Sequence, residues 1–171
     1  MAETGSVAVT VRLATLDDLD AMMAQREAIA AEGRWIGAEL PLDEDRDRAS
    51  FTSGIEEGRS FVAELDGELV GLIGLHPTGY GVVDLGMQVA DGHRGQGVGS
   101  ALLEAGIAWA REHGAHKMSL QHWPHNEAAR ALYEKYGFVQ EGYLRRQYPR
   151  KNGEIWDAVV MGLLLEDAGH G

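Results

Sequence analysis

The chain has 171 residues, of which 44% are hydrophobic and 25% are charged, a composition typical of a folded domain. Its formal net charge of −12 argues against nonspecific binding to nucleic acid, which needs a basic surface. Because the sequence has no cysteine, it can form no disulfide, no zinc–cysteine site and no cysteine acyl-enzyme.

The sequence also lacks the features of a membrane protein. No apolar run approaches the ~20 residues that a membrane span needs, and the polar, acidic residues 1–6 do not resemble a signal peptide. We therefore expect a cytoplasmic protein. The negative charge would suit a cationic substrate such as a polyamine or a protein amine, although solubility is the simpler explanation.

The first half of the chain predicts one strand, two helices and a three-stranded meander. β-branched alternation marks a strand at 7–14, and Thr15, Asp17 and Asp18 then mark a helix start. That helix should run to about residue 31, and a charged helix should follow at 43–57. Antiparallel strands are expected at 61–65, 68–75 and 82–89, with turns at 66–67 and 77–81.

The second half alternates helices and strands. We expect a helix at 98–112, a strand at 117–122, a helix at 126–136, and strands at 138–146 and 156–165. The order is β α α β β β α β α β β. With no repeat and no linker, it predicts a single α/β domain over residues 1–171, with its core at about 7–165.

A glycine-rich loop stands between the strand at 82–89 and the helix at 98–112. Gly95, Gly97 and Gly99 are spaced by two residues. A loop of this kind presents free backbone N–H groups at the positive end of a helix, where phosphate oxygens bind. Glycine allows positive φ and a close approach of the ligand, and Arg94 adds a positive charge.

Two common phosphate-binding motifs do not fit this loop. Gly92 and Gly97 have the spacing of a P-loop, but Val98 occupies the position of the required lysine. A dinucleotide fingerprint that starts at Gly95 would need glycine at Ser100, and it would need a βαβ unit at the start of the fold.

The motif Arg94-x-x-Gly97-x-Gly99 resembles the Gln/Arg-x-x-Gly-x-Gly/Ala motif of the GCN5-related N-acetyltransferases (GNAT). Residues 126–138 are similar to a second motif of that family, Asn-x-x-Ala-x-x-Leu-Tyr-x-x-x-Gly-Phe. Residues 141–146, 153–157 and 161–164 are similar to small bacterial members that act on small amines, amino acids or protein N-termini.

The resemblance implies a mixed, mostly antiparallel sheet of about seven strands flanked by four helices. It also implies an enzyme that moves an acetyl group from acetyl-CoA to a primary amine, and homodimers are common in the family. Because the chain has no cysteine, direct attack of the amine in a ternary complex is the simplest mechanism. The implied contacts with acetyl-CoA come from the end of a strand, the glycine loop and the following helices: Gln88, Val89, Arg94, Gly95, Gln96, Gly97, Val98, Gly99, Ser100, Asn126 and Tyr133.

The resemblance makes Tyr133 the candidate acid for the leaving thiolate, while Tyr136 better fits a core aromatic. Many relatives carry a glutamate on the strand before Asn126, where this chain has Gln121, which cannot act as a base. The candidates for the base are a water relay, His122 and Asp84. His122 is expected to point to the opposite face of the strand from Gln121.

The acceptor site is predicted less specifically. Trp35, Glu39 and Tyr148 lie in loops that border the acceptor cleft in this family, and Glu39 could hold an amine. The two His-x-x-His pairs at 113–116 and 122–125 lack a third ligand at metal-binding spacing, so we expect no metal. The alternative to an enzyme is a non-catalytic acyl-CoA-binding module on the same fold.

Overall fold

The computed structural model describes residues 8–165. The elements follow the predicted order: β1 (Thr10–Leu13), a 3₁₀ helix (Leu16–Asp18), α1 (Leu19–Glu32), α2 (Glu44–Glu56), β2 (Ser60–Leu65), β3 (Glu68–Pro77), β4 (Val82–Val89), α3 (Val98–Glu112), β5 (Lys117–His122), α4 (Glu127–Lys135), β6 (Val139–Pro149) and β7 (Ile155–Leu164). The bounds of β4, α3 and β5 agree with the sequence prediction. The predicted first strand begins at Val7, which lies outside the described residues.

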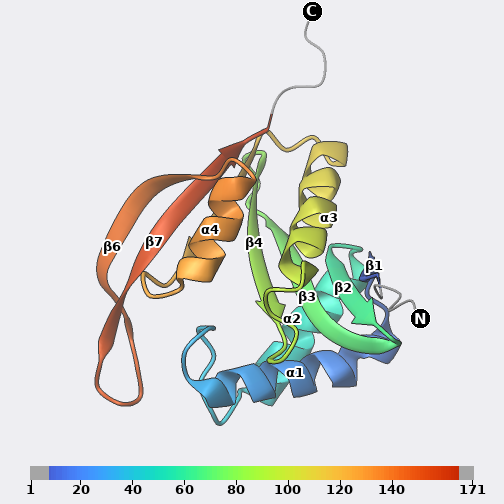
Figure 1. Ribbon diagram of the computed structural model, residues 1–171, viewed down its shortest axis with the longest axis horizontal. Coiled ribbons are helices and arrows are strands. Elements are labelled where there is room, and N and C mark those ends of the chain that lie inside the picture. The colour runs from blue at the N-terminus through green and yellow to red at the C-terminus, as the bar shows by residue number, and fades with distance from the viewer. Residues whose placement is uncertain (1–7, 166–171) are drawn as a thin grey trace, which may run out of the picture.

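The strands form one sheet in the order β1-β2-β3-β4-β5-β7-β6 (Figure 1). Neighbouring strands are antiparallel except β4 and β5, which are parallel. The predicted fold class is therefore confirmed: a mixed, mostly antiparallel sheet of seven strands with four helices.

Helices cover both faces of the sheet, and the alternation along β2 and β3 shows how. Ala63 and Ile73 pack in the larger core cluster with α3. Val62 and Leu72, one position away on each strand, pack in a second cluster with Met22 of α1 and Ile55 of α2. Since successive side chains of a strand point to opposite faces, α3 lies on one face and the α1–α2 pair on the other.

The chain enters α1 through a 3₁₀ turn rather than directly at Thr15. The Asp18 carboxylate accepts the Thr15 N–H at 2.7 Å and two hydrogen bonds of 2.8 Å from the Arg12 guanidinium. Chiefly because of Arg12, the pKa of Asp18 falls to about 2. This ion pair joins the end of β1 to the start of α1.

β6 is longer than predicted because a bulge bends it without ending it. Arg146 has a φ of 52°, and its N–H donates to Asp157 Oδ1 at 2.6 Å. The pairing with β7 shifts between Leu144 and Tyr148 and then continues to Pro149. The resulting β6–β7 hairpin extends well beyond the rest of the sheet (Figure 1).

None of the helices in residues 8–165 combines the length and apolar content that a membrane crossing requires.

Candidate active site

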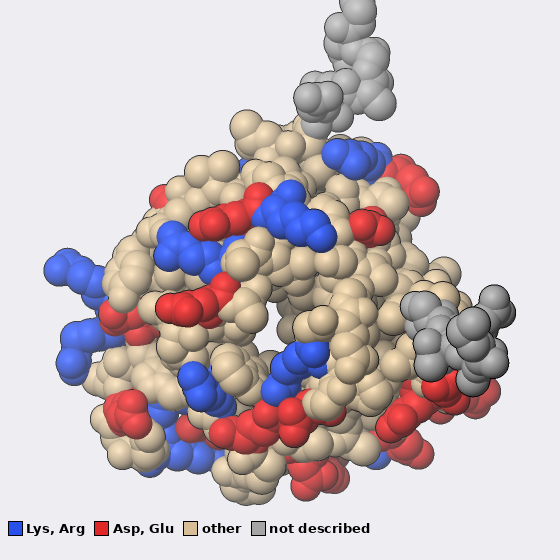
Figure 2. Space-filling view, in the orientation of Figure 1, with Lys and Arg blue, Asp and Glu red and all other residues tan. Residues whose placement is uncertain are grey.

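The site begins where β4 and β5 separate. The two strands pair only from Val82–Lys117 to Asp84–Ser119, although β4 remains paired with β3 as far as Val89. Because alternate residues of a strand turn their N–H and C=O toward the same neighbour, residues 85–89 present free backbone groups toward the gap. Figure 2 shows the molecule hollowed beside β4, with basic and acidic side chains around the opening.

The glycine loop forms one wall of a cavity of 300 Å³. Gly95 and Gly97 have φ values of 75° and 84°, which favour glycine, and Gly97 caps α3. The Ala101 N–H donates to Gly97 O at 3.0 Å, and the preceding N–H groups of the helix have no carbonyl within reach in the helix. This end of α3 can therefore bind an anion through its N–H groups and its dipole.

Most of the predicted acetyl-CoA contacts line this first cavity: Gln88, Val89, Arg94, Gly95, Gly97, Gly99, Ser100, Asn126 and Tyr133. Gln96 and Val98 are not among its lining residues. The exposed Gln96 side chain donates to Gly92 O at 3.3 Å, and the Val98 side chain is buried in the core.

The sequence predicts that the positive charge of Arg94 is free to bind phosphate, but in the structure Arg94 is paired with Glu32. Its guanidinium makes two hydrogen bonds to Glu32, of 2.7 and 2.8 Å, and its Nε donates to Val89 O at 3.1 Å. The pKa of Glu32 is lowered, mainly by this contact. Arg94 therefore joins the end of α1 to the end of β4, and its charge is already compensated.

Tyr133 of α4 lines both this cavity and a second, larger one of 510 Å³. Its side chain is buried against Phe138, with ring centroids 5.6 Å apart. Burial raises the pKa of Tyr133 to about 12, so the phenol keeps its proton at neutral pH.

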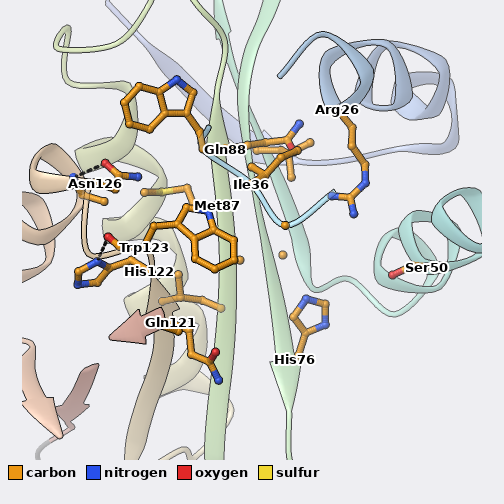
Figure 3. A pocket seen from close by; sticks show the side chains of 18 of the residues that line it. Arg26, Ile36, Ser50, His76, Met87, Gln88, Gln121, His122, Trp123 and Asn126 are labelled. Carbon is orange, nitrogen blue, oxygen red and sulfur yellow. Dashed lines mark hydrogen bonds between the residues drawn. The ribbon is translucent and has the colours of Figure 1, made fainter. Parts of the chain in front are cut away.

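The second cavity lies between the sheet, the α1–α2 side and the β6–β7 hairpin (Figure 3). Its aromatic lining residues are Trp35, Phe51, Trp123, Tyr133 and Tyr148, and its polar ones are Arg26, Asp47, Ser50, Ser60, His76, Gln88, Gln121, His122, Asn126 and Arg150. Trp123 packs edge-on against Trp156 at 5.0 Å and against Tyr148 at 5.4 Å.

Two of the predicted acceptor-site residues, Trp35 and Tyr148, line the second cavity. Tyr148 donates a hydrogen bond of 2.5 Å from its hydroxyl to Gln121 Oε1. Gln121, at the position where many relatives have glutamate, thus holds the tyrosine of the hairpin in place.

Glu39 is not among the lining residues. Its Oε1 lies 3.3 Å from Arg150 Nε, and both carboxylate oxygens accept the Lys151 N–H at 3.2 Å. The Arg150 guanidinium in turn stacks on Trp156, 4.1 Å from the ring centroid. Glu39 therefore ties the loop after α1 to the hairpin, and in this arrangement its carboxylate is not available to an amine.

The two candidate bases lie in different surroundings. His122 is buried and lines the second cavity, and its ring is turned to the far side of Trp123 from Arg26 and His76 (Figure 3). Its Nδ1 lies 2.9 Å from Trp123 O, and its buried Nε2 has no hydrogen-bond partner within residues 8–165. Burial lowers the pKa of His122, so the ring is neutral at pH 7.

Asp84 is exposed, pairs with His76 across β3 and β4, and lines neither cavity. The structure therefore does not bring Asp84 together with Tyr133.

Two features of the site were not predicted from the sequence. Gln88 Nε2 donates to Gln25 Oε1 at 3.0 Å, and both residues are more than nine-tenths buried. Arg26, next to Gln25 on α1, and Arg150 also line the second cavity. In the sequence, Gln25 and Arg26 are distinguished only as a polar pair within a helix that is predicted to be amphipathic. No motif includes Arg150.

Within the part of the chain that the structure describes, no group of three or more histidine, aspartate or glutamate side chains is arranged to hold a metal ion.

Comparison with known proteins identifies the family. The sequence pattern of the acetyltransferase (GNAT) family matches residues 23–138, which include the glycine loop, β5 and α4. The chain belongs to the GNAT family. The match spans both motifs that line the first cavity.

Relatives in this family carry acetyltransferase names. A Pseudomonas aeruginosa protein named L-methionine sulfoximine/L-methionine sulfone acetyltransferase is 28% identical over 167 residues, which cover 94% of this chain and 96% of that protein. The crystal structure of a ribosomal-protein-alanine N-acetyltransferase from Brucella melitensis is 28% identical, has a TM-score of 0.83, and covers 91% of this chain and 99% of that one.

A third similarity concerns the fold alone. A GNAT superfamily phosphinothricin acetyltransferase from Sinorhizobium meliloti, solved in complex with acetyl-CoA, is 21% identical, with a TM-score of 0.82 over 92% of this chain and 88% of that one.

Proposed function

We propose that the chain transfers an acetyl group from acetyl-CoA to a primary amine, by direct attack of the amine in a ternary complex. The observation that carries this proposal is that Tyr133 lines both cavities. One cavity ends at the N–H groups of α3, and the other opens toward the hairpin. A donor in the first and an amine in the second would meet beside the Tyr133 phenol.

The first cavity has the features that acetyl-CoA requires, and the donor supplies the thioester that the amine attacks. The N–H groups of the glycine loop and of the start of α3 would bind the diphosphate. The edge of β4 at Gln88 and Val89, which β5 does not pair with, would contact the amide groups of the pantetheine arm. Asn126 Oδ1 already accepts the Ala129 N–H at 3.1 Å, so its amide NH₂ is the group left to contact the arm.

The chemistry needs an acid and a base. The amine nitrogen forms a bond to the thioester carbonyl carbon, the carbon–sulfur bond breaks, and the sulfur takes the Tyr133 proton. The attacking nitrogen loses one proton, and the tyrosinate is then reprotonated. Burial keeps the Tyr133 phenol protonated at neutral pH, so the proton that this step requires is present.

Two candidates remain for the base: His122 and a water relay. His122 is favoured over Asp84, since it lines the acceptor cavity and is neutral at pH 7. Its ring is turned aside, so a water molecule between His122 and the amine fits this role as well as direct contact does.

The names of the relatives are the basis for the proposed class of acceptor amine. Their names give amino-acid analogues and the alanine of a ribosomal protein as substrates. We propose a small amine of the amino-acid type, or a peptide N-terminus, for this chain.

An acceptor screen tests the function. Purified protein with acetyl-CoA is offered amino acids, polyamines, antibiotics and peptide N-termini, and thiol release is measured together with the mass of the product. We expect acetylation of at least one amine class. Binding of acetyl-CoA without turnover on any amine would instead support the non-catalytic module, and thermal stabilisation by ATP or NAD but not by acetyl-CoA would contradict both.

A further inference from the structure

We propose that the acceptor carries an anionic group, such as a carboxylate, in addition to its amine, and that Arg26 binds this group in the second cavity. The inference rests on the proposed acetyl transfer and names the substrate class for that same site.

The guanidinium of Arg26 has a free end that belongs to the cavity. Arg26 extends from α1 into the space that Ser50 and His76 also line (Figure 3). Its Nε donates to Asp47 Oδ2 at 2.9 Å, and the group lies 5.9 Å from the centroid of the Phe51 ring. Within residues 8–165, no hydrogen-bond partner is recorded for Nη1 or Nη2. These two nitrogens form the planar fork that binds a carboxylate through two parallel hydrogen bonds.

Asp47 fixes this orientation. Its side chain is only 6% exposed, and it lies at the start of α2, across from α1. Because Asp47 takes the Nε side of the guanidinium, the opposite end remains available to a ligand. Arg46 also approaches Asp47, with Nε at 3.6 Å from Oδ1, but its side chain is 70% exposed and does not line the cavity.

The charges that line the cavity favour an anion. Asp47 is the only carboxylate among the lining residues, and Arg26 and Arg46 both lie against it. The other lining cation, Arg150, is paired with Glu39 and donates to Gly37 O at 3.1 Å. The pKa of His76 is lowered, first by burial, so this ring is neutral at pH 7. Asp47 pairs with Arg26 through Nε, and the Nη1 and Nη2 donors of Arg26 are left for an anionic group.

This interior contrasts with the net charge of −12, which would have suited a polyamine. A polyamine needs a carboxylate for each ammonium group that does not react, and the cavity lining offers no free one. An amine with a carboxylate carries the hydrogen-bond acceptor that Nη1 and Nη2 of Arg26 require. The cavity of 510 Å³ is large enough for an amino acid beside the thioester.

The test compares acceptors that differ only in this charge. The matched pairs are L-methionine and L-methioninamide, L-leucine and L-leucinamide, and L-phenylalanine and L-phenylalaninamide, with spermidine as a polyamine. Both binding to the protein–CoA complex, by calorimetry, and acetyl transfer are measured. We expect each acid to bind at least tenfold more tightly than its amide, and spermidine to bind no better than the amides. The amides have the less basic amine, so a larger fraction of it is neutral and able to attack at pH 7, which opposes this preference.

Two variants assign the preference to Arg26. Arg26→Gln should reduce the affinity and kcat/KM for the acids about 10- to 100-fold and leave the amides unchanged. Arg26→Lys keeps the charge beside Asp47 but lacks the fork, and it should give an intermediate loss. Arg46→Gln, which removes the other arginine beside Asp47, should leave the preference intact. Thermal unfolding and the Kd for acetyl-CoA serve as controls for folding.

The outcomes separate the two proposals. Wild-type protein that binds and acetylates amides or spermidine as well as the acids overturns the anionic subsite and leaves the acetyltransferase standing. Selective binding of the acids without transfer to any amine supports the subsite and contradicts the enzyme. Equal loss for acids and amides in Arg26→Gln, or binding of no acid at all, also overturns the assignment to Arg26.

Discussion

The two cavities that meet at Tyr133 are built in different ways. The first cavity, which we propose as the donor cavity, is made largely from one continuous stretch, β4, the glycine loop and the start of α3, with α4 on its other side. The second cavity, which we propose as the acceptor cavity, takes its lining from α1, α2, the strands from β2 to β7 and the loops between them. The first uses backbone groups, whereas the second uses side chains that lie far apart in the chain.

This difference explains what each cavity can recognise. Backbone N–H groups at a helix start bind any suitably placed phosphate, and they require glycine where φ is positive. Side chains such as Arg26, His76 and Tyr148 can be exchanged without disturbing that loop. The donor side can thus remain constant across a family while the acceptor side changes with the substrate.

The largest predicted effect is on kcat, for a change at Tyr133, where the two cavities meet. Tyr133→Phe removes the proton that we propose the leaving sulfur takes, but it keeps the ring that packs on Phe138. We expect kcat to fall about 100-fold or more, with the Kd for acetyl-CoA unchanged within about twofold. Steady-state kinetics and calorimetry measure the two quantities.

Tyr136→Phe is the matched control for this change. Tyr136 lies one helical turn away, lines neither cavity, and donates its hydroxyl hydrogen to Glu104 at 2.6 Å. Its loss should leave kcat within about twofold. If Tyr133→Phe retains full turnover, Tyr133 is not the acid, and the link between the two cavities is one of position only.

The pH dependence of kcat/KM gives a second test of the roles proposed for Tyr133 and His122. His122 has lost its proton by pH 7, and Tyr133 keeps its proton until about pH 12. Neither group changes its charge between pH 7 and 10, so kcat/KM should follow the deprotonation of the acceptor amine. We expect a rise of about tenfold per pH unit below the pKa of the amine and then a plateau. A descending limb below pH 10 would show that a chain group with a lower pKa acts as the acid.

A change in the glycine loop tests the donor cavity alone. Gly97 has a φ of 84°, and no atom lies within 4 Å of the Cβ that alanine would add. Gly97→Ala should therefore act through backbone strain, which costs about 1–2 kcal/mol and displaces the N–H groups at the start of α3. We expect the Kd for acetyl-CoA to rise about tenfold.

Gly79→Ala separates strain from binding. Gly79 has a φ of 91° in the turn between β3 and β4, and the space around it is equally open. The two variants should lose similar stability in thermal unfolding, but only Gly97→Ala should bind acetyl-CoA more weakly. A similar loss of affinity in both would mean that the loop has no specific role.

The contrast between the cavities also explains which parts the sequence could predict. The bounds of α3 and the lining residues from Val89 to Ser100 follow from a local pattern of glycine and apolar residues, because chain neighbours build that wall. Arg26, Gln25 and Arg150 carry no such signal. Arg150 meets Glu39 only because the β6–β7 hairpin reaches the loop after α1, a contact between residues 111 positions apart in the numbering that depends on the whole sheet. For the same reason the sequence alone predicts a Glu39 carboxylate that could hold an amine, because nothing in the sequence marks Arg150 as its partner.

The smallest predicted effect concerns Arg94, where the sequence indicates phosphate binding and the structure shows an ion pair. If the pair with Glu32 is the main role of Arg94, then Arg94→Gln, Glu32→Gln and the double variant should each raise the Kd for acetyl-CoA by a similar factor, about two- to fivefold. Each removes the same link between α1 and β4, and a partly exposed pair contributes about 0–1 kcal/mol. If Arg94 instead binds the diphosphate, Glu32→Gln should free its charge and lower the Kd, while Arg94→Gln alone raises it. Calorimetry at two salt concentrations distinguishes the cases. If Arg94 contacts phosphate directly, the Kd for acetyl-CoA should rise more steeply with salt in the wild type than in Arg94→Gln.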